Sequence, residues 1–306
     1  MSHITVIGST NIDLIMKMKD LPVRGETITG GEFMQTFGGK GANQAVGAAR
    51  AGGKVTFISC VGDDHYGKQC IENFNNDGLD TSRMFVEKNI ATGTALIMIG
   101  KGGDNMITVA PGANFRMTPK YIDTIKEVLE KSEYILLQYE IPKETLYYII
   151  ETCAELKKKV IFNLAPADDF DSYHVSLLHT LVVNEVEAEF LAGCPVQSME
   201  DIRKAAEKLQ DMGPENVIIT LGAEGSYVAS GNYHEKIPAY TVEALDTTAA
   251  GDVYCGSLAV AMVEGMPLHK AVGFASAASA LSVTRMGAQP SAPYRKEIDA
   301  MIKMED

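Results

Sequence analysis

The stretch from residue 135 to residue 219 contains four short apolar runs, Ile135-Leu136-Leu137, Val160-Ile161-Phe162, Leu181-Val182-Val183 and Val217-Ile218-Ile219. Segments with helical periodicity occur near 143–156 and 199–212, between these runs. Short apolar strands that alternate with amphipathic helices are typical of a parallel sheet with helices on both faces. The pattern therefore predicts an α/β fold built around a doubly wound, mostly parallel sheet.

Polar side chains follow the ends of several predicted strands, the first of which is Ile4-Thr5-Val6-Ile7. They are Asn11, Asp13, Glu140, Asn163, Asn184 and Thr220. Ligands of open α/β sheets bind at the carboxyl ends of the strands. We therefore expect these side chains to share one cleft.

Two other patches, 14–37 and 93–110, alternate apolar and polar residues, which indicates β-strands. The second patch contains the turn Gly100-Lys101-Gly102-Gly103-Asp104. The patches could pair into a small separate sheet, or they could supply ordinary strands of the central sheet. The pattern alone leaves both arrangements open.

The segment Asp246-Thr247-Thr248-Ala249-Ala250-Gly251-Asp252 precedes an apolar helical run over 253–263. Small residues at a helix N-terminus leave backbone N–H groups free to bind an anion. The Asp252 carboxylate beside them could accept a proton from an alcohol, and this combination suggests phosphoryl transfer to a hydroxyl. The structural alternative is an Ala-rich packing surface in which Asp252 only caps the helix.

A second motif, Gly38-Gly39-Lys40-Gly41-Ala42-Asn43-Gln44-Ala45, leads into a helical run that ends at Gly52-Gly53. It is not a P-loop, because Gly41 follows Lys40, and it lacks the third glycine of a dinucleotide fingerprint. What remains is a Gly-rich turn with Lys40 and Asn43 as the polar groups that face a ligand. A tight turn before an ordinary helix is the alternative.

Both motifs resemble those of the ribokinase-like, or PfkB, carbohydrate kinases, and the resemblance runs the whole length of the chain. Other similar segments lie at 9–13, 163–166, 184–187, 220–225 and 284–291. The turn at 39–45 is most similar to the ribokinase branch, and Ser257 stands where the family usually has Ala or Gly. The resemblance implies one kinase domain over 1–306 that uses ATP to phosphorylate D-ribose at its 5-hydroxyl.

By the same resemblance, Asp252 is the catalytic base, and the amides of Ala249, Ala250 and Gly251 form the anion hole for the transferred phosphoryl group. The implied sugar ligands, besides Asp252, are Asn11, Asp13, Gly39, Lys40, Asn43 and Glu140. This set offers both donors and acceptors, and each sugar hydroxyl needs both. Taken singly, Asp13 and Glu140 could be solvated strand ends, and Asn43 a helix-start residue.

For the nucleotide, the family pattern points to Asn184, Thr220, Gly222, Gly225, Gly251 and Ser276. Many relatives carry an amide or imidazole at the position of Ser276. Asn184 and Glu187 lie three residues apart at a helix start and resemble the motif that organises Mg²⁺ through waters. Magnesium keeps several waters, so few protein ligands suffice. A solvated helix residue is the alternative for Glu187.

The resemblance also implies a monovalent cation, K⁺, beside the anion hole. Its ligands would be the Asp246 carboxylate, Ser291 and the carbonyls of Thr248, Ser282, Arg285 and Gly287. Such an ion would fix the shape of the loop without touching the substrate.

Composition limits the partners. A net charge of −13 argues against a nucleic-acid or anionic-membrane partner. No run of 18 apolar residues and no signal-peptide pattern is present, which excludes a transmembrane span of that kind. Five cysteines without a Cys-x-x-Cys motif suggest reduced thiols and a cytoplasmic protein. The six histidines have no zinc spacing.

The two β patches should form a lid over the sugar site, because an open cleft would allow transfer to water. The lid carries apolar residues that need cover: Ile28, Phe33, Leu96, Met98, Ile107 and Val109. The resemblance implies that two chains cover each other, lid against lid, in a homodimer.

Three rival functions stay open from the sequence. A kinase of the same fold could act on deoxyribose, pseudouridine or a ketohexose. Asn11 favours ribose, because a 2-deoxy sugar would leave a buried amide unpaired at a cost of about 1–3 kcal/mol. A non-catalytic sugar or nucleotide sensor would not need Asp252. A dinucleotide-dependent oxidoreductase lacks its fingerprint here.

Overall fold

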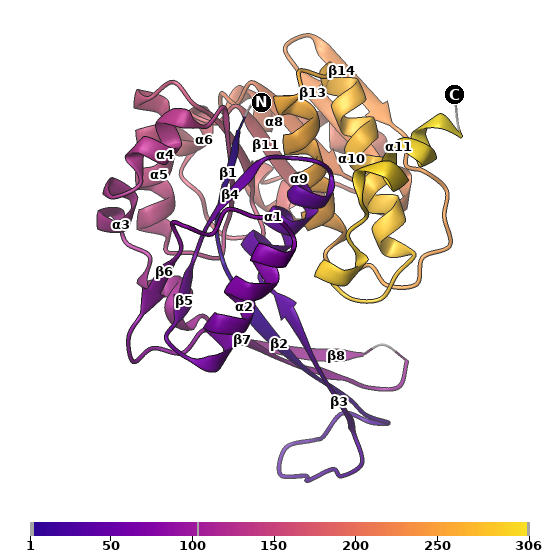
Figure 1. Ribbon diagram of the computed structural model, residues 1–306. Coiled ribbons are helices and arrows are strands. Elements are labelled where there is room, and N and C mark those ends of the chain that lie inside the picture. The colour runs from indigo at the N-terminus through magenta and orange to yellow at the C-terminus, as the bar shows by residue number, and fades with distance from the viewer. Residues whose placement is uncertain (1–2, 103, 305–306) are drawn as a thin grey trace.

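A central sheet of eight strands divides the molecule into two layers of helices (Figure 1). The structure, a computed structural model, describes residues 3–102 and 104–304. In sheet order the strands are β14 (Tyr233–Ile237), β13 (Ser226–Ser230), β12 (Asn216–Thr220), β11 (Thr180–Asn184), β10 (Lys159–Asn163), β9 (Tyr134–Gln138), β1 (Ile4–Ile7) and β4 (Val55–Ile58). All neighbours from β12 to β4 are parallel, and β13 and β14 are antiparallel. The predicted α/β, mostly parallel fold is confirmed.

Helices bury apolar side chains on both faces of this sheet. One core lies under α1 (Lys40–Arg50), α2 (His65–Asn76), α9 (Ala250–Val263), α10 (Leu268–Val283) and α11 (Arg295–Lys303). The other lies under α3 (Pro119–Asp123), α4 (Lys126–Lys131), α5 (Lys143–Glu155), α6 (Ser172–Ser176), α7 (Glu185–Ala192) and α8 (Met199–Asp211). In β10, Ile161 joins the first core while Val160 and Phe162 join the second. The period-two alternation of a strand explains this division.

The two β patches form a separate four-stranded sheet, ordered β3-β2-β7-β8, which we call the lid sheet. Its strands are β2 (Asn11–Lys17), β3 (Glu32–Gly38), β7 (Gly93–Ile99) and β8 (Asn105–Ala110). It extends from one end of the domain (Figure 1). The separate-sheet prediction is therefore confirmed, and the alternative of central strands is wrong. The first strand starts at Asn11, before the predicted boundary at 14.

The remaining elements are short. They are the strand pair β5 (Cys60–Gly62) and β6 (Phe85–Glu87), and the 3₁₀ turns η1 (Gly112–Arg116), η2 (Gly222–Glu224) and η3 (Gln289–Ser291). Within the described ranges 3–102 and 104–304, no helix is long and apolar enough to cross a membrane.

Glycine allows α1 and α9 to cross in close contact. A Cβ atom at Gly256 would lie 2.4 Å from the Gln44 carbonyl oxygen and 2.7 Å from the Ala48 nitrogen. Real Cβ atoms do not approach backbone so closely, so only glycine fits at this crossing. The crossing places the first turns of the two helices side by side, and both motifs of the sequence lie in these turns.

Candidate active site

The Asp252 carboxylate lies between the two motifs and is only 6% exposed. It accepts hydrogen bonds from Asn43 Nδ2 at Oδ2 and from Gln44 Nε2 at Oδ1, each 3.0 Å long. It does not cap its own helix, because the N-cap of α9 is Ala249 and no side chain caps that end. The capping alternative is therefore wrong, and Asp252 is a buried acceptor held from a second helix.

The first turn of α9 is an open helix N-terminus. Ala249 adopts a left-handed conformation with φ 60° and ψ 13°, which is uncommon for a residue with a side chain. The Ala250 amide donates to the Thr247 carbonyl at 3.2 Å, so it is engaged within the turn. The Gly251 amide has no backbone acceptor in the described part of the chain. The Gly251 amide is thus available at this helix end, the Ala250 amide is less free than expected, and an anion hole here stays a prediction.

Two of the predicted sugar ligands, Lys40 and Glu140, meet at the start of α1. Glu140 Oε2 accepts from the Lys40 backbone amide at 2.9 Å and from the Ser9 hydroxyl at 2.5 Å. It is therefore not a solvated strand end. The Asp252 carboxylate raises the pKa of the Lys40 ammonium, against the effect of burial, and Glu140 adds to the rise.

Asn11 and Asp13 lie at the lid end of the site. The Asn11 Oδ1 atom accepts from Asn114 Nδ2 at 2.8 Å, which leaves the Asn11 amide hydrogens for a ligand. Burial, and then the charge of Glu140, raise the pKa of Asp13 to about 6, so Asp13 is not a solvated strand end either. Gly39, with φ 90°, has no room for a side chain, because a Cβ would lie 2.8 Å from the Asn11 nitrogen. The sugar candidates thus form one connected group from Asn11 to Asp252.

A polar cavity of about 240 Å³ opens on Asp252. Lys40, Asn163, Asn184, Glu187 and Gly251 also line it. Asn11, Asp13, Gly39, Asn43 and Glu140 are not among its lining residues, although Glu140 contacts Lys40 and Asn43 contacts Asp252.

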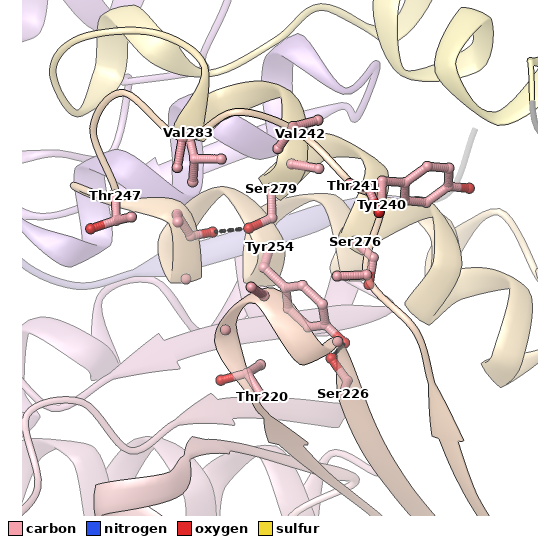
Figure 2. Close-up of a pocket in the computed structure, with 18 residues that line it drawn as sticks. Thr220, Ser226, Tyr240, Thr241, Val242, Thr247, Tyr254, Ser276, Ser279 and Val283 are labelled. Carbon is pink, nitrogen blue, oxygen red and sulfur yellow. Dashed lines mark hydrogen bonds between the residues drawn. The ribbon is translucent and has the colours of Figure 1, made fainter.

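A larger, more apolar cavity of about 330 Å³ adjoins the first (Figure 2). It contains five of the predicted nucleotide residues: Thr220, Gly222, Gly225, Gly251 and Ser276. Asn184 lies outside it and lines the polar cavity. Both cavities share Thr220, Thr247, Ala250 and Gly251, so they meet at the N-terminus of α9.

Asn184 and Glu187 form a reciprocal capping box at the start of α7. Asn184 Oδ1 accepts from the Glu187 amide and Glu187 Oε2 accepts from the Asn184 amide, both at 2.8 Å. Burial raises the pKa of Glu187, and the Asn184 amide and Lys40 partly offset the rise. Glu187 is buried, so the alternative that it is a solvated helix residue is wrong. The capping hydrogen bond uses its Oε2 and leaves Oε1 for another contact.

In the loop predicted to bind a cation, the Asp246 carboxylate accepts hydrogen bonds from both Thr248 and Gly287. Its Oδ1 accepts from the amide and hydroxyl of Thr248 at 2.9 and 2.6 Å, and its Oδ2 accepts from the Gly287 amide at 2.8 Å. These hydrogen bonds lower the pKa of Asp246 although burial opposes them. The Ser282 carbonyl accepts from the Arg285 amide at 3.1 Å, and the buried Ser291 hydroxyl donates to Ala288. Asp246, Thr248 and Gly287 are thus adjacent, while Ser282 and Ser291 already have partners.

Several residues of the site had no predicted role. Gln44 and Gln138 are fully buried and bonded to each other, and Asn114 orients Asn11. The lining of the apolar cavity also includes the segment 239–242, Ala244, Tyr254, Ser279 and Val283. Gln138 and Gln44 carry a weak signal, since one ends a strand and the other lies in the Gly-rich motif. For Asn114 and the segment 239–242 we find no sequence signal.

The whole chain matches known proteins. Residues 1–295 match the pfkB family of carbohydrate kinases. The chain belongs to this family. This pfkB family carbohydrate kinase is 38% identical to the ribokinase of Haemophilus influenzae, with 96% of each chain covered. It is 36% identical to the deoxyribokinase of Salmonella typhi over 99% of each. The ribokinase of Arabidopsis thaliana, solved in complex with ribose and ATP, has a TM-score of 0.93 and 30% identity, with 99% of each chain covered.

The pfkB family carbohydrate kinase is therefore a ribokinase-like sugar kinase, as the sequence motifs predict. Relatives named for two different sugars match it almost equally well, so the sugar has to be inferred from the residues of the site.

Proposed function

We propose that this kinase transfers the γ-phosphoryl group of ATP to the 5-hydroxyl of D-ribose. The observation that carries the proposal is the meeting of two cavities at one helix N-terminus with Asp252 beside it. The apolar cavity suits a base and ribose, and the polar cavity suits phosphates and a sugar. The relative from Arabidopsis thaliana, solved with ribose and ATP, supports this pairing of ligands.

In this proposal Asp252 orients the sugar hydroxyl and takes its proton late in the transfer. The Gly251 amide and the Lys40 ammonium face the same cavity and stabilise the charge on the phosphoryl oxygens. Asn43 holds the Asp252 carboxylate, and its own Oδ1 is buried and without a partner among the described residues, so it would accept a sugar hydroxyl only after becoming accessible.

Two metal ions belong to the proposal. Mg²⁺ would be held through waters by Asn184 and Glu187, and it neutralises phosphate charge when bound. K⁺ would be held by the Asp246 carboxylate, Ser291 and carbonyls of Thr248, Ser282, Arg285 and Gly287. The Asp246 carboxylate and the neighbouring carbonyls of Thr248 and Gly287 are hard oxygen donors, which suits such a cation.

The lid sheet supports a homodimer. By strand register, Phe33 and Leu96 lie on the face opposite to Asp13, and they are 59% and 50% exposed in the single chain. Ile107 lies on the Asp13 face and is also exposed. Apolar residues on both faces are better explained by a second lid sheet than by solvent.

A kinase assay over ribose, 2-deoxyribose, pseudouridine and a ketohexose tests the sugar. We expect ribose to have the highest kcat/KM, because a 2-deoxy sugar leaves one buried donor unpaired. Deoxyribose is the second candidate, on account of the deoxyribokinase relative. A higher kcat/KM for deoxyribose would overturn the assignment of ribose.

The substitution Asp252→Asn tests the chemistry. It should remove most turnover, by about 10²–10⁴-fold, while sugar binding survives, because the amide keeps the shape of the carboxylate. A folded variant that keeps more than about a tenth of wild-type turnover would show that Asp252 is not the base.

A further inference from the structure

Behind Asp252 lies a chain of buried side-chain amides that does not reach the cavity surface except at Asn163. Gln138 Nε2 donates to Gln44 Oε1 at 2.6 Å. Gln44 Nε2 then donates both to Asn163 Oδ1 and to Asp252 Oδ1, each at 3.0 Å. Asn163 Nδ2 donates to the Val182 carbonyl at 3.2 Å. Gln44 and Gln138 are 0% exposed.

The backbone of β11 fixes the direction of this chain. The Val182 carbonyl can only accept, so Asn163 must turn its amide group toward it and its Oδ1 toward Gln44. Gln44 must then present its amide group to Asn163, and the same group reaches Asp252. The orientation of Gln44 therefore does not depend on the state of the carboxylate.

Gln44 has no donor left for a substrate, and as a fully buried side chain it is out of a substrate's reach. Both hydrogens of its amide group are used, and its Oε1 accepts from Gln138. The Gln138 side chain, in turn, lies in a space that Gly8 leaves open. A Cβ at Gly8 would lie 1.9 Å from Gln138 Oε1, so Gly8 leaves just the space that the Gln138 carboxamide occupies.

We propose that Gln44 is a positioning residue for the transfer reaction: it holds the Asp252 carboxylate in the orientation that receives the substrate proton, and Gln138 and Asn163 fix Gln44. This inference rests on the proposed role of Asp252 as base. The Asp252 carboxylate can rotate about the bond that joins it to the side chain. A single hydrogen bond from Asn43 would hold one oxygen and would not prevent this rotation. With donors on both oxygens, one from each of two adjacent residues of α1, the carboxylate is fixed in its plane.

In the described part of the chain three titratable groups interact with Asp252, and one of them, Cys255, is a neutral thiol because burial raises its pKa well above the ordinary value. Lys40 lies on α1, Glu187 on α7 and Cys255 on α9, and each interacts electrostatically with Asp252. A substitution at Gln44 leaves these groups in place. A change in the pH dependence of turnover would therefore report the lost hydrogen bond.

The test compares the wild type, Gln44→Met and Gln44→Glu. For each protein it measures kcat, the KM for sugar and the pH at which kcat is half-maximal on the acid limb. Gln44→Met keeps the volume but cannot donate, so kcat should fall by about 10- to 100-fold while KM changes by less than about 3-fold. The half-maximal pH should rise by about half a unit or more, because the ionised carboxylate loses a donor. Gln44→Glu places a second carboxylate at this contact, and the rise should reach about one unit or more.

Asn216→Leu is the matched control. Asn216 is a buried amide at the start of β12 that donates to the His179 carbonyl and the Thr180 hydroxyl, away from both cavities. It should lower thermal stability without moving the pH profile. If Gln44→Met does not fold, Gln138→Met removes only the donor behind Gln44 and should shift the half-maximal pH in the same direction.

The outcomes separate the two proposals. The positioning role alone would be refuted if Asp252→Asn is inactive while folded Gln44→Met has the kcat and pH profile of the wild type. If Gln44→Met does not fold, the same result for Gln138→Met would refute it. An active Asp252→Asn would refute the base and with it this inference. A fall in kcat at constant KM with the pH shift, absent from Asn216→Leu, is the result we expect.

Discussion

Asp13 should destabilise the unliganded protein at neutral pH, so Asp13→Asn should stabilise it. The Asp13 side chain packs on Gly38, where a Cβ would lie 2.2 Å from its Oδ2, and no hydrogen bond to its carboxylate is found in the described ranges. Burial and Glu140 raise the pKa of Asp13 to about 6, from an ordinary value of 3.8.

The sign follows from proton linkage. Because the pKa is higher in the folded protein than in the unfolded chain, folding binds a proton between these two values, and stability is lost as the pH rises through about 6. A shift of two units corresponds to about 3 kcal/mol. Asp13 is partly exposed, and solvent screening reduces this to about 1–2 kcal/mol. Asparagine has the same shape without the charge.

Urea unfolding of the wild type and Asp13→Asn at several pH values measures the effect. The variant should gain about 1–2 kcal/mol at pH 8, and the gain should shrink between pH 6.5 and pH 4. The exposed Asp20→Asn controls for net charge. A difference between wild type and variant that stays constant over this range, or a less stable variant at pH 8, would refute the reasoning.

The same carboxylate should couple sugar binding to pH. Sugar hydroxyls that donate to Asp13 favour its ionised form, so binding should release a proton below about pH 6 and affinity should rise with pH through that value. Calorimetric titration in buffers of different ionisation enthalpy detects the proton. In Asp13→Asn the affinity should be weaker and independent of pH.

Four further predictions concern the framework of the site. K⁺ should raise turnover more than Na⁺ at constant ionic strength, and Asp246→Ala should flatten the response, because its carboxylate ties Thr248 to Gly287; equal rates without K⁺ would contradict the cation site. Leu96→Glu should convert a dimer to monomers with weaker sugar binding, as sedimentation would show, whereas a monomeric wild type would remove the dimer but not the kinase. Gly256→Ala should lower the free energy of unfolding in urea by about 1–3 kcal/mol, because the new methyl group overpacks against α1. The control Gly273→Ala, where a Cβ meets nothing within 4 Å, should show no loss. Arg50→Met should lower the free energy of unfolding by about 3 kcal/mol. Arg50 pairs with both oxygens of Asp77 and donates to the carbonyls of Gln289 and Ala292. A loss below about 1 kcal/mol would show that these contacts are dispensable.

The sequence predicts those parts of the fold that local patterns determine. The parallel strands β9 to β12 appear as apolar runs, and the uncapped N-terminus of α9 appears as small residues before a helix, because each follows from neighbouring residues. The sequence does not decide between a separate lid sheet and central strands, since β2 pairs with β7 about 80 residues away and pairing partners have no local signature.

The contacts within the site could not be predicted in the same way. Gln44 and Asp252 are 208 residues apart and meet only because Gly256 lets two helices touch. The engaged Ala250 amide depends on the left-handed Ala249, a conformation that nothing in the residue type suggests. Gln44 lies inside a family motif but has no ligand role in the resemblance, and Gln138 and Asn114 lie outside the family motifs.

The close crossing of α1 and α9 also governs how the chain can be made in the cell. The buried face of α1 includes Ala45, Val46 and Ala48, and its cover comes from a helix that starts at Ala250. During synthesis, most of the chain must therefore emerge before this apolar face can be covered. A chain that stops at residue 249 should bind an apolar dye and a chaperone, and should lack any active site, whereas the full chain should not bind the dye. Nascent chains of this kinase should thus be exposed to aggregation until α9 has been synthesised.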